Sequence, residues 1–330
     1  MHILKKYNKR RSFKSERATI PYEERNIHRK TILVFLLAGM LSLTAACDGS
    51  GLDRVTPEAE KGQQENVNSS EGWQQGSADS SVAQQEEIFP VTREDSRVIS
   101  ESPVKWDLST MISPLIITEG GDYLLTGNSD STILIRAEDQ NVHLFLDGVQ
   151  IETGEGSAIQ VESAGKLLIT LVEGSSNVLA DSARYAADSA SKAAIYSVCD
   201  LTINGSGKLS VYGYHEDAVY SKDKLKVLGG DYFIQAKGDA LRGSDGVLLQ
   251  PDKLEIEAER SGIRTVNSGK ENKGTISLEA GDVSIIAGKY GMETAQDLYI
   301  MNCALYLKTV VSDYQVEGNS YIDERCLSDE

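Results

Sequence analysis

The sequence contains few of the residue types that enzymes and metal proteins most often use for chemistry. It has four histidines and four cysteines among 330 residues. No two cysteines form a Cys-x-x-Cys pair, which argues against a cysteine metal site. Beyond residue 46 the histidines are His143 and His215, and neither belongs to a recognisable Ser/His/Asp arrangement. The chain therefore leans away from an enzyme, although the sequence leaves that question open.

Aromatic residues are also scarce, at 6%, and no long amphipathic helix pattern appears after residue 110. Together with 29 glycines, this composition favours an all-β fold with many turns. Basic residues concentrate in residues 1–30, whose net charge is +7, so the rest of the chain carries −24. So acidic a body repels nucleic acid and anionic membrane surfaces, which leaves divalent cations and sugars as the expected partners.

The chain also lacks an apolar run long enough for a convincing transmembrane helix. A basic segment precedes the uncharged run of residues 31–46, which is typical of a signal peptide. Thr44-Ala45-Ala46 directly before Cys47 resembles a bacterial lipobox, in which the cysteine is lipidated. We therefore predict a lipoprotein-type signal peptide over residues 1–46 and an extracellular, cell-surface protein that meets the membrane only through a lipid at Cys47. An ordinary secretory signal followed by a chance cysteine is the alternative.

Residues 47–103 are rich in Ser, Gln and Glu and show no apolar periodicity. Such a segment cannot bury enough apolar surface to fold. It is predicted to be a disordered tether that lets a folded domain, residues 104–330, reach away from the anchor.

The C-terminal half contains a repeat of about 22 residues. A small residue followed by an apolar one recurs at Ala194-Ile195, Ala218-Val219, Ala240-Leu241, Gly262-Ile263 and Gly291-Met292. Each unit continues with two apolar-x-apolar triplets, such as Leu201-Thr202-Ile203 and Leu209-Ser210-Val211. Three short strands per unit cannot bury a face alone, but stacked units bury all their faces together. The predicted fold is an all-β, single-stranded parallel β-helix with three short strands per coil.

Two insertions interrupt this repeat. Residues 180–193 lengthen one step to 36 residues and are predicted to project from a corner as a loop, and residues 267–274 form a smaller insertion. Among the cysteines, Cys199 is expected to point inward. The odd number that remains after Cys47 permits at most one bridge, for which Cys303 and Cys326 are the candidates.

Several motifs in this region resemble one known family. They are Gly120–Gly127, Leu144–Ile151, Leu201–Leu209 and Asp217–Leu225. Together, in order over roughly residues 112–310, they look like the bacterial extracellular carbohydrate-binding domain proteins, whose fold is similar to that of pectate lyases. The resemblance implies a right-handed parallel β-helix, polysaccharide binding and bound calcium in a secreted lipoprotein.

Residues one repeat apart lie on neighbouring coils, about 4.8 Å apart, so equivalent positions form ladders. The ladder two places after each small residue reads Tyr196, Tyr220, Arg242, Arg264 and Glu293. Strand alternation turns it outward, where Tyr rings can stack on sugars and guanidinium groups can pair with uronate carboxylates. We predict the two tyrosines and two arginines as ligand-binding residues. The alternative is a solvated face on which neighbouring carboxylates balance the arginines.

The turn before the small residue carries a second ladder, Asp217 and Asp239, with Glu216 beside it. Stacked carboxylates repel each other unless a cation bridges them, and oxygen ligands suit Ca²⁺. Ser261 and Tyr290 interrupt this row in the later coils. Asp217, Asp239 and Glu216 are the predicted calcium ligands; that Asp simply suits a turn is an equally good explanation.

These features favour a non-catalytic, surface-anchored monomer that binds a plant or cell-wall polysaccharide, with Ca²⁺ assisting and uronate units suiting the arginines. Two alternatives stay open. A pectate-lyase-like enzyme would use calcium to acidify its substrate beside a basic residue, and Asp217, Asp239 and Arg242 could supply these parts. A surface adhesin would instead recognise protein partners.

Overall fold

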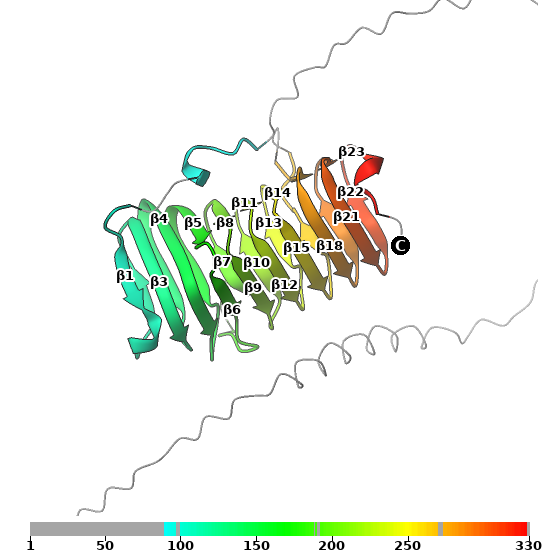
Figure 1. Cartoon of the computed structure of the whole chain (residues 1–330). Coiled ribbons are helices and arrows are strands. Elements are labelled where there is room, and N and C mark those ends of the chain that lie inside the picture. The colour runs from blue at the N-terminus through cyan, green and yellow to red at the C-terminus, as the bar shows by residue number, and fades with distance from the viewer. Residues whose placement is uncertain (1–88, 97–99, 188, 190–191, 270–272, 329–330) are drawn as a thin grey trace, which may run out of the picture. The chain divides into compact units, whose positions relative to one another are not determined.

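The repeat winds into a parallel β-helix, which confirms the fold expected from the sequence. A computed structural model describes residues 89–96, 100–187, 189, 192–269 and 273–328. Its 23 strands form one continuous hydrogen-bonded sheet whose coils follow one another along the axis in Figure 1. Within the described residues, no helix is both long enough and apolar enough to traverse a bilayer. The predicted signal peptide, the lipidation site Cys47 and the tether up to residue 88 lie outside the described residues.

Three faces result, because most coils contribute three strands. The ladder face contains β2 (Leu115–Ile117), β7 (Ala193–Ser197), β10 (Asp217–Ser221), β13 (Leu241–Gly243), β16 (Ile263–Arg264), β19 (Tyr290–Thr294) and β22 (Ser312–Val316). The strap face contains β1 (Val104–Asp107), β8 (Leu201–Gly205), β11 (Lys224–Leu228), β14 (Gly246–Gln250), β17 (Thr275–Leu278), β20 (Leu298–Ile300) and β23 (Ser320–Ile322). The third face contains β6 (Ser176–Ala180), β9 (Lys208–Gly213), β12 (Asp231–Ala236), β15 (Lys253–Ala258), β18 (Gly281–Ala287) and β21 (Cys303–Thr309). The long strands β3 (Gly121–Ser129), β4 (Ile133–Glu152) and β5 (Ile159–Leu171) pair with strands of more than one face.

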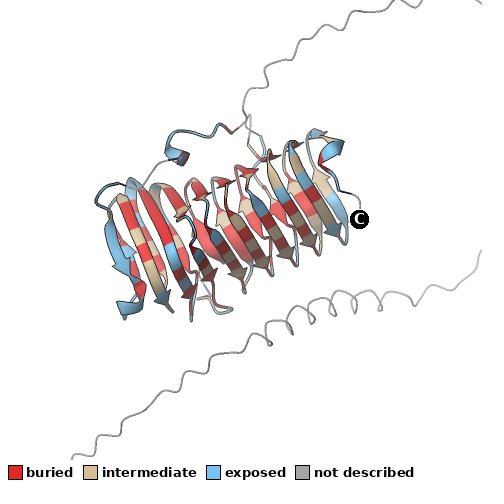
Figure 2. Cartoon of the chain, viewed as in Figure 1, coloured by how far each residue is buried: buried red, intermediate tan, exposed pale blue. Residues whose placement is uncertain are grey.

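The core lies inside the coils and consists of stacked apolar side chains. The ladder of Ile195, Val219, Leu241, Ile263 and Met292 is in register across β7, β10, β13, β16 and β19. Each of these residues is at most 1% exposed, and Figure 2 shows the buried positions recurring from coil to coil. Burying each such side chain contributes about 1.5–3 kcal/mol. The predicted core ladder is therefore confirmed.

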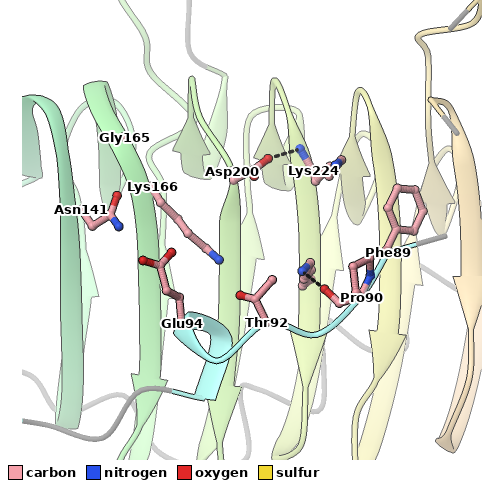
Figure 3. Close-up of a pocket in the computed structure, with 10 residues that line it drawn as sticks. Phe89, Pro90, Thr92, Glu94, Asn141, Gly165, Lys166, Asp200 and Lys224 are labelled. Carbon is pink, nitrogen blue, oxygen red and sulfur yellow. Dashed lines mark hydrogen bonds between the residues drawn. The ribbon is translucent and has the colours of Figure 1, made fainter. Parts of the chain in front are cut away.

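Part of the predicted tether folds onto the strap face, which corrects the boundary at residue 103. Residues 89–96, here called the strap, include the short 3₁₀ helix η2 (Glu94–Ser96) and cross several strands in Figure 3. Phe89 is buried against Leu228 and Leu248. Asp95 is also buried, because its carboxylate meets the lysines of the strap face described below. The folded domain thus includes residues that precede β1.

Short 3₁₀ helices lie near both ends of the described β-helix. The helix η3 (Leu108–Thr110) follows β1 and buries Leu108. The helix η4 (Glu324–Cys326) follows β23, and its Cys326 joins the main core. A parallel bridge between Leu305 and Leu327 holds the residues after η4 against β21. These segments cover core side chains that the terminal coils would otherwise leave open to water.

Candidate functional site

The predicted ligand ladder lies on the outer side of the ladder face. Tyr196, Tyr220, Arg242, Arg264 and Glu293 are paired in register across β7, β10, β13, β16 and β19. The same alternation that buries their neighbours in the core turns these side chains away from it. The structure therefore brings together all four residues that the sequence proposed as ligand contacts.

Access to this ladder differs along its length. Tyr196 is only 2% exposed, which corrects the expectation that its ring faces solvent. Its ring packs edge-on against Tyr220, with the ring centroids 5.6 Å apart, and the Lys222 Nζ atom lies 5.8 Å from its centroid. Tyr220 is half-buried. Tyr196 therefore supports the neighbouring ring and is not itself an open stacking surface.

Arg242 and Arg264 are held to different degrees. The Arg242 guanidinium carbon lies 4.3 Å from the Tyr220 ring centroid, and its Nη1 atom donates to Asp217 at a long 3.4 Å. Arg264 Nη1 donates to Asp239 at 3.2 Å, and its Nε atom lies 3.6 Å from Glu293 Oε1. Arg242 stacks on an aromatic ring and has the looser carboxylate contact, so its guanidinium is better placed to meet a ligand.

Asp217 and Asp239 link successive coils through the backbone. Asp217 Oδ1 accepts a hydrogen bond from the Asp239 N–H at 2.8 Å, and Asp239 Oδ1 accepts one from the Ser261 N–H at 3.1 Å. Gly238 makes the first contact possible, since a Cβ atom there would lie 2.4 Å from Asp217 Oδ1. Each carboxylate thus caps a backbone donor of the next coil at the corner where the chain enters the ladder face.

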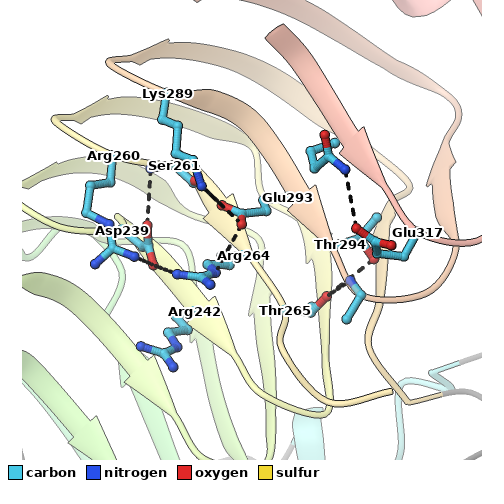
Figure 4. Close-up of polar contacts among 12 residues, drawn as sticks. Asp239, Arg242, Arg260, Ser261, Arg264, Thr265, Lys289, Glu293, Thr294 and Glu317 are labelled. Carbon is cyan, nitrogen blue, oxygen red and sulfur yellow. Dashed lines mark hydrogen bonds and ion pairs between the residues drawn. The ribbon is translucent and has the colours of Figure 1, made fainter. Parts of the chain in front are cut away.

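The second oxygen of each aspartate faces arginine, and this arrangement does not fit calcium. Asp217 Oδ2 meets Arg242 at 3.4 Å, whereas Asp239 Oδ2 meets Arg264 at 3.2 Å and Arg260 at 3.6 Å (Figure 4). Calcium takes six to eight oxygen ligands. Nowhere in the described part of the chain do three or more His, Cys, Asp or Glu side chains gather as a metal site.

The third predicted calcium ligand, Glu216, also lies apart from such a site. Its carboxylate is exposed and its Oε1 atom lies 3.7 Å from Lys192 Nζ. The calcium ligands proposed from sequence are therefore corrected to a chain of aspartate–backbone and aspartate–arginine contacts. The cation that the stacked carboxylates call for is supplied by guanidinium groups of the protein itself.

The carboxyl groups at the two ends of this chain of contacts, Asp217 and Glu293, have pKa values shifted in opposite directions. Burial and the negative charge of Asp239 raise the pKa of Asp217 to about 6, against the opposing effects of the Asp239 N–H and Arg242. At Glu293, burial favours a higher pKa, but the hydrogen bond from Ser261 and nearby positive charges outweigh it and lower the pKa. Asp217 can therefore exchange a proton near neutral pH, while Glu293 stays ionised.

A cavity of about 170 Å³ lies beside the ladder and is lined by Lys192, Glu216, Asp217, Tyr220 and Arg242. It combines an aromatic ring, two cations and two carboxylates. Sequence reasoning missed Lys192, which belongs to the insertion of residues 180–193. The register could have found it, because Ala193 pairs with Asp217 and so places Lys192 one coil from Glu216.

A larger cavity of about 320 Å³ lies beside the strap (Figure 3) and is lined by Phe89, Pro90, Thr92, Glu94, Asn141, Gly165, Lys166, Asp200, Lys224 and Lys226. Two of its lining lysines, Lys166 and Lys226, are already paired with the buried Asp95. Asp95 accepts from Lys166 Nζ at 2.5 Å, Lys226 Nζ at 2.8 Å and Thr202 Oγ1 at 2.7 Å. Burial would raise the pKa of Asp95, but these contacts hold it well below its usual range. We take the cavity on the ladder face as the candidate site, because it lies beside the predicted ligand ladder.

Comparisons with known proteins agree with this geometry. The family model described as carbohydrate-binding domain-containing protein matches residues 113–325. A protein of the same description from Acetivibrio thermocellus is 28% identical over 217 residues, which is 64% of this chain and 76% of the relative. The solved structure of the polysaccharide lyase-like protein from C. thermocellum has a TM-score of 0.65 and 28% identity, and the similarity covers 68% of this chain and 98% of that one. The family match includes the entire cavity beside the ladder.

Proposed function

Because the chain belongs to the carbohydrate-binding domain-containing protein family, we propose that it binds an extended polysaccharide along the ladder face. The observation that carries this proposal is the cavity at Lys192, Glu216, Asp217, Tyr220 and Arg242, which opens beside a ladder in register. A polymer can meet such a ladder repeatedly, because each coil presents equivalent positions about 4.8 Å further along the axis.

Four of the five lining residues can contact a sugar chain directly. The half-buried Tyr220 ring offers an apolar face to a sugar ring, and the Arg242 guanidinium above it offers paired donors for a carboxylate or hydroxyl groups. Lys192 Nζ and the Glu216 carboxylate, 3.7 Å apart on the rim, add a donor and an acceptor. This set suits a polysaccharide that contains uronate units, since Lys192 and Arg242 give the cavity two cations that can pair with uronate carboxylates.

We further propose that this binding is non-catalytic and takes place at the cell surface. Support comes from the sequence, which carries a signal-peptide pattern, Cys47 and a polar tether ahead of the domain. We also propose that this binding mode does not use calcium; the arginine contacts to Asp217 and Asp239 support this. A lipid anchor and tether would hold captured glycan close to the cell.

The test is binding of the full chain to polygalacturonate and to a neutral glucan by isothermal calorimetry, with and without EDTA. Arg242→Ala should weaken polygalacturonate binding by about 10-fold or more, the usual effect of losing a hydrogen bond to a charged group. Arg325→Ala is the matched control, because Arg325 is exposed at η4 and pairs with Asp323. EDTA should leave the affinity unchanged.

Three results would contradict parts of the proposal. Failure to bind any glycan would remove polysaccharide binding itself. Undiminished binding by both Arg242→Ala and Tyr220→Ala would place the glycan on another face. Binding that is lost on addition of EDTA would restore calcium to the binding mode.

A second candidate function is polysaccharide cleavage by β-elimination. It is favoured by Asp217, whose pKa is raised to about 6 beside Arg242 in an open cavity. A carboxyl group that titrates near neutral pH can accept a proton from a substrate. Cleavage of polygalacturonate would release unsaturated products that absorb in the ultraviolet. If the protein binds polygalacturonate but releases no such product across a broad pH range, cleavage is rejected and binding alone remains.

A further inference from the structure

Two free cysteines, Cys303 and Cys326, lie next to each other near the C-terminal end of the β-helix. Cys303 begins β21 and Cys326 ends η4, and both are free thiols. The Cys303 N–H donates to Cys326 Sγ at 3.3 Å. Cys326 is 3% exposed and Cys303 is half-buried, so both thiols lie at the edge of the core.

We propose that Cys303 and Cys326 form an oxidative modification site, which a disulfide-class oxidant converts into a bond that locks η4 over the last coils. Backbone contacts between the residues that follow the two cysteines already hold the two chain segments together. Leu305 and Leu327 form a parallel bridge, and the Ser328 N–H donates to the Leu305 carbonyl at 3.0 Å. Both segments are therefore held in place before any covalent bond forms.

The cross-link would act where a β-helix is weakest. A terminal coil has a neighbour on one side only, so its segments separate from the stack more easily than central coils. The link would close the loop that contains β22 and β23 and would keep η4 on the core. Cys199 offers an internal comparison, because its Sγ atom lies 3.4 Å from Ser197 Oγ in the middle of the stack.

The reaction is two thiol–disulfide exchanges. One cysteine thiolate attacks a sulfur of the oxidant, forming a mixed disulfide and releasing one reduced thiol. The second cysteine thiolate then attacks the protein sulfur of that mixed disulfide and releases the second reduced thiol. The cysteine pair loses two protons and two electrons, and the oxidant is reduced to two thiols.

The timing of this reaction follows from burial. Burial and the neighbouring Cys326 raise the pKa of Cys303 to about 12, so little thiolate is present in the folded protein at neutral pH. Thiolate is the attacking species. Oxidation is therefore expected chiefly while the C-terminal coils are still folding or transiently open, and slowly once η4 is in place.

The experiment refolds the full chain carrying Cys47→Ser in a buffer of oxidised and reduced glutathione, alkylates free thiols and digests with trypsin. The expected product is the peptide 290–308 linked through Cys303 to the peptide 326–330, with Cys199 alkylated. Alkylation of both Cys303 and Cys326 at every redox ratio would overturn the proposal. A cross-link to Cys199, or a glutathione adduct on Cys303 alone, would do the same.

A stability readout shows whether the bond locks the end of the β-helix. Reductant should lower the melting temperature of the oxidised protein by about 5–10 °C, the usual range for a disulfide in a domain of this size. Cys303→Ser should show no response to reductant, whereas Cys199→Ser should respond like the parent protein. A cross-linked protein whose melting temperature ignores reductant would refute the locking role.

Discussion

Replacing Asp95 by alanine tests whether the strap is a folded part of the domain. The Asp95 side chain is fully buried and accepts from Lys166 Nζ at 2.5 Å and from Lys226 Nζ at 2.8 Å. Both lysine side chains are nearly buried, at 12% and 11% exposure. The alanine variant would leave these two ammonium groups, and the Thr202 hydroxyl, without the carboxylate that they contact.

The magnitude follows from the cost of an unpaired buried charge. Removing one partner of a buried ion pair typically destabilises a protein by about 3–5 kcal/mol. The strap can leave the β-helix without unfolding it, so this cost appears first as strap opening and not as global unfolding. A change of about 3 kcal/mol raises the open population more than 100-fold, since about 1.4 kcal/mol corresponds to a factor of ten.

Limited proteolysis measures this population directly. Arg93 is exposed on the strap, and cleavage of the Arg93–Glu94 bond by dilute trypsin tracks the open state when opening is fast. The rate, followed by mass spectrometry, should rise about 100-fold in Asp95→Ala. Glu101→Ala is the control, because Glu101 is an exposed acid outside the strap and away from the scissile bond. A rate for Asp95→Ala within threefold of the parent rate would refute the reasoning.

Acid should open the strap as well. The contacts with Lys166 and Lys226 outweigh burial and depress the pKa of Asp95 below its unfolded value of about 4. A depressed carboxyl pKa stabilises the folded form above the unfolded pKa, and the stabilisation is lost as pH falls toward the folded pKa. Hydrogen exchange of the strap amides should therefore lose protection below about pH 4, before the central coils do. Equal loss in both regions would contradict a separately docked strap.

Three further predictions address the ladder face, the core and the strap contact. Asp217→Asn should become more stable relative to the parent as pH rises. Between about pH 4 and pH 8 its free energy of unfolding should gain about 2–3 kcal/mol on that of the parent, because a folded pKa near 6 destabilises the parent once Asp217 ionises. Urea unfolding at both pH values measures this change. Leu241→Ala should cost about 2–5 kcal/mol in urea unfolding and Arg242→Ala, one residue away, much less; similar losses would contradict the alternation. Gly246→Ala should release Phe89, since its Cβ atom would lie 2.2 Å from the Phe89 ring, and the readout is faster trypsin cleavage of the strap.

The sequence predicts the coil register well, because neighbouring coils pair residues at a nearly constant separation. A step of 22 residues joins Tyr220 to Arg242 and Arg242 to Arg264, and both pairs are neighbours in the structure. Alternation then decides which side chains face the core, because strand residues point to opposite sides in turn. For this reason the inward ladder and the order of the outward ladder could both be predicted.

Contacts that cross between ladders could not be predicted in the same way. Tyr196 occupies an outward position in the repeat, yet neighbouring side chains cover it. Asp95 contacts Lys166 and Lys226 from 71 and 131 residues away. A segment that docks once on a repetitive surface leaves no period in the sequence, so the polar composition around it indicated a tether.

The arginines explain why the aspartate ladder ends where it does. Asp217 and Asp239 each accept from the backbone of the next coil and from an arginine 25 residues further along the chain. At the third coil the position holds Ser261, whose hydroxyl donates to Glu293 at 2.6 Å, and Glu293 is the acid that also lies beside Arg264. At this coil the carboxylate therefore belongs to the outward ladder, as Glu293, and not to the corner. Arg264 lies between Asp239 and Glu293 and so contacts two carboxylates. Arg242 lacks that second acid in its own ladder, where its neighbours are Tyr220 and Arg264. An acidic sugar bound in the cavity beside Arg242 would supply the second acid that Glu293 supplies to Arg264 one coil later.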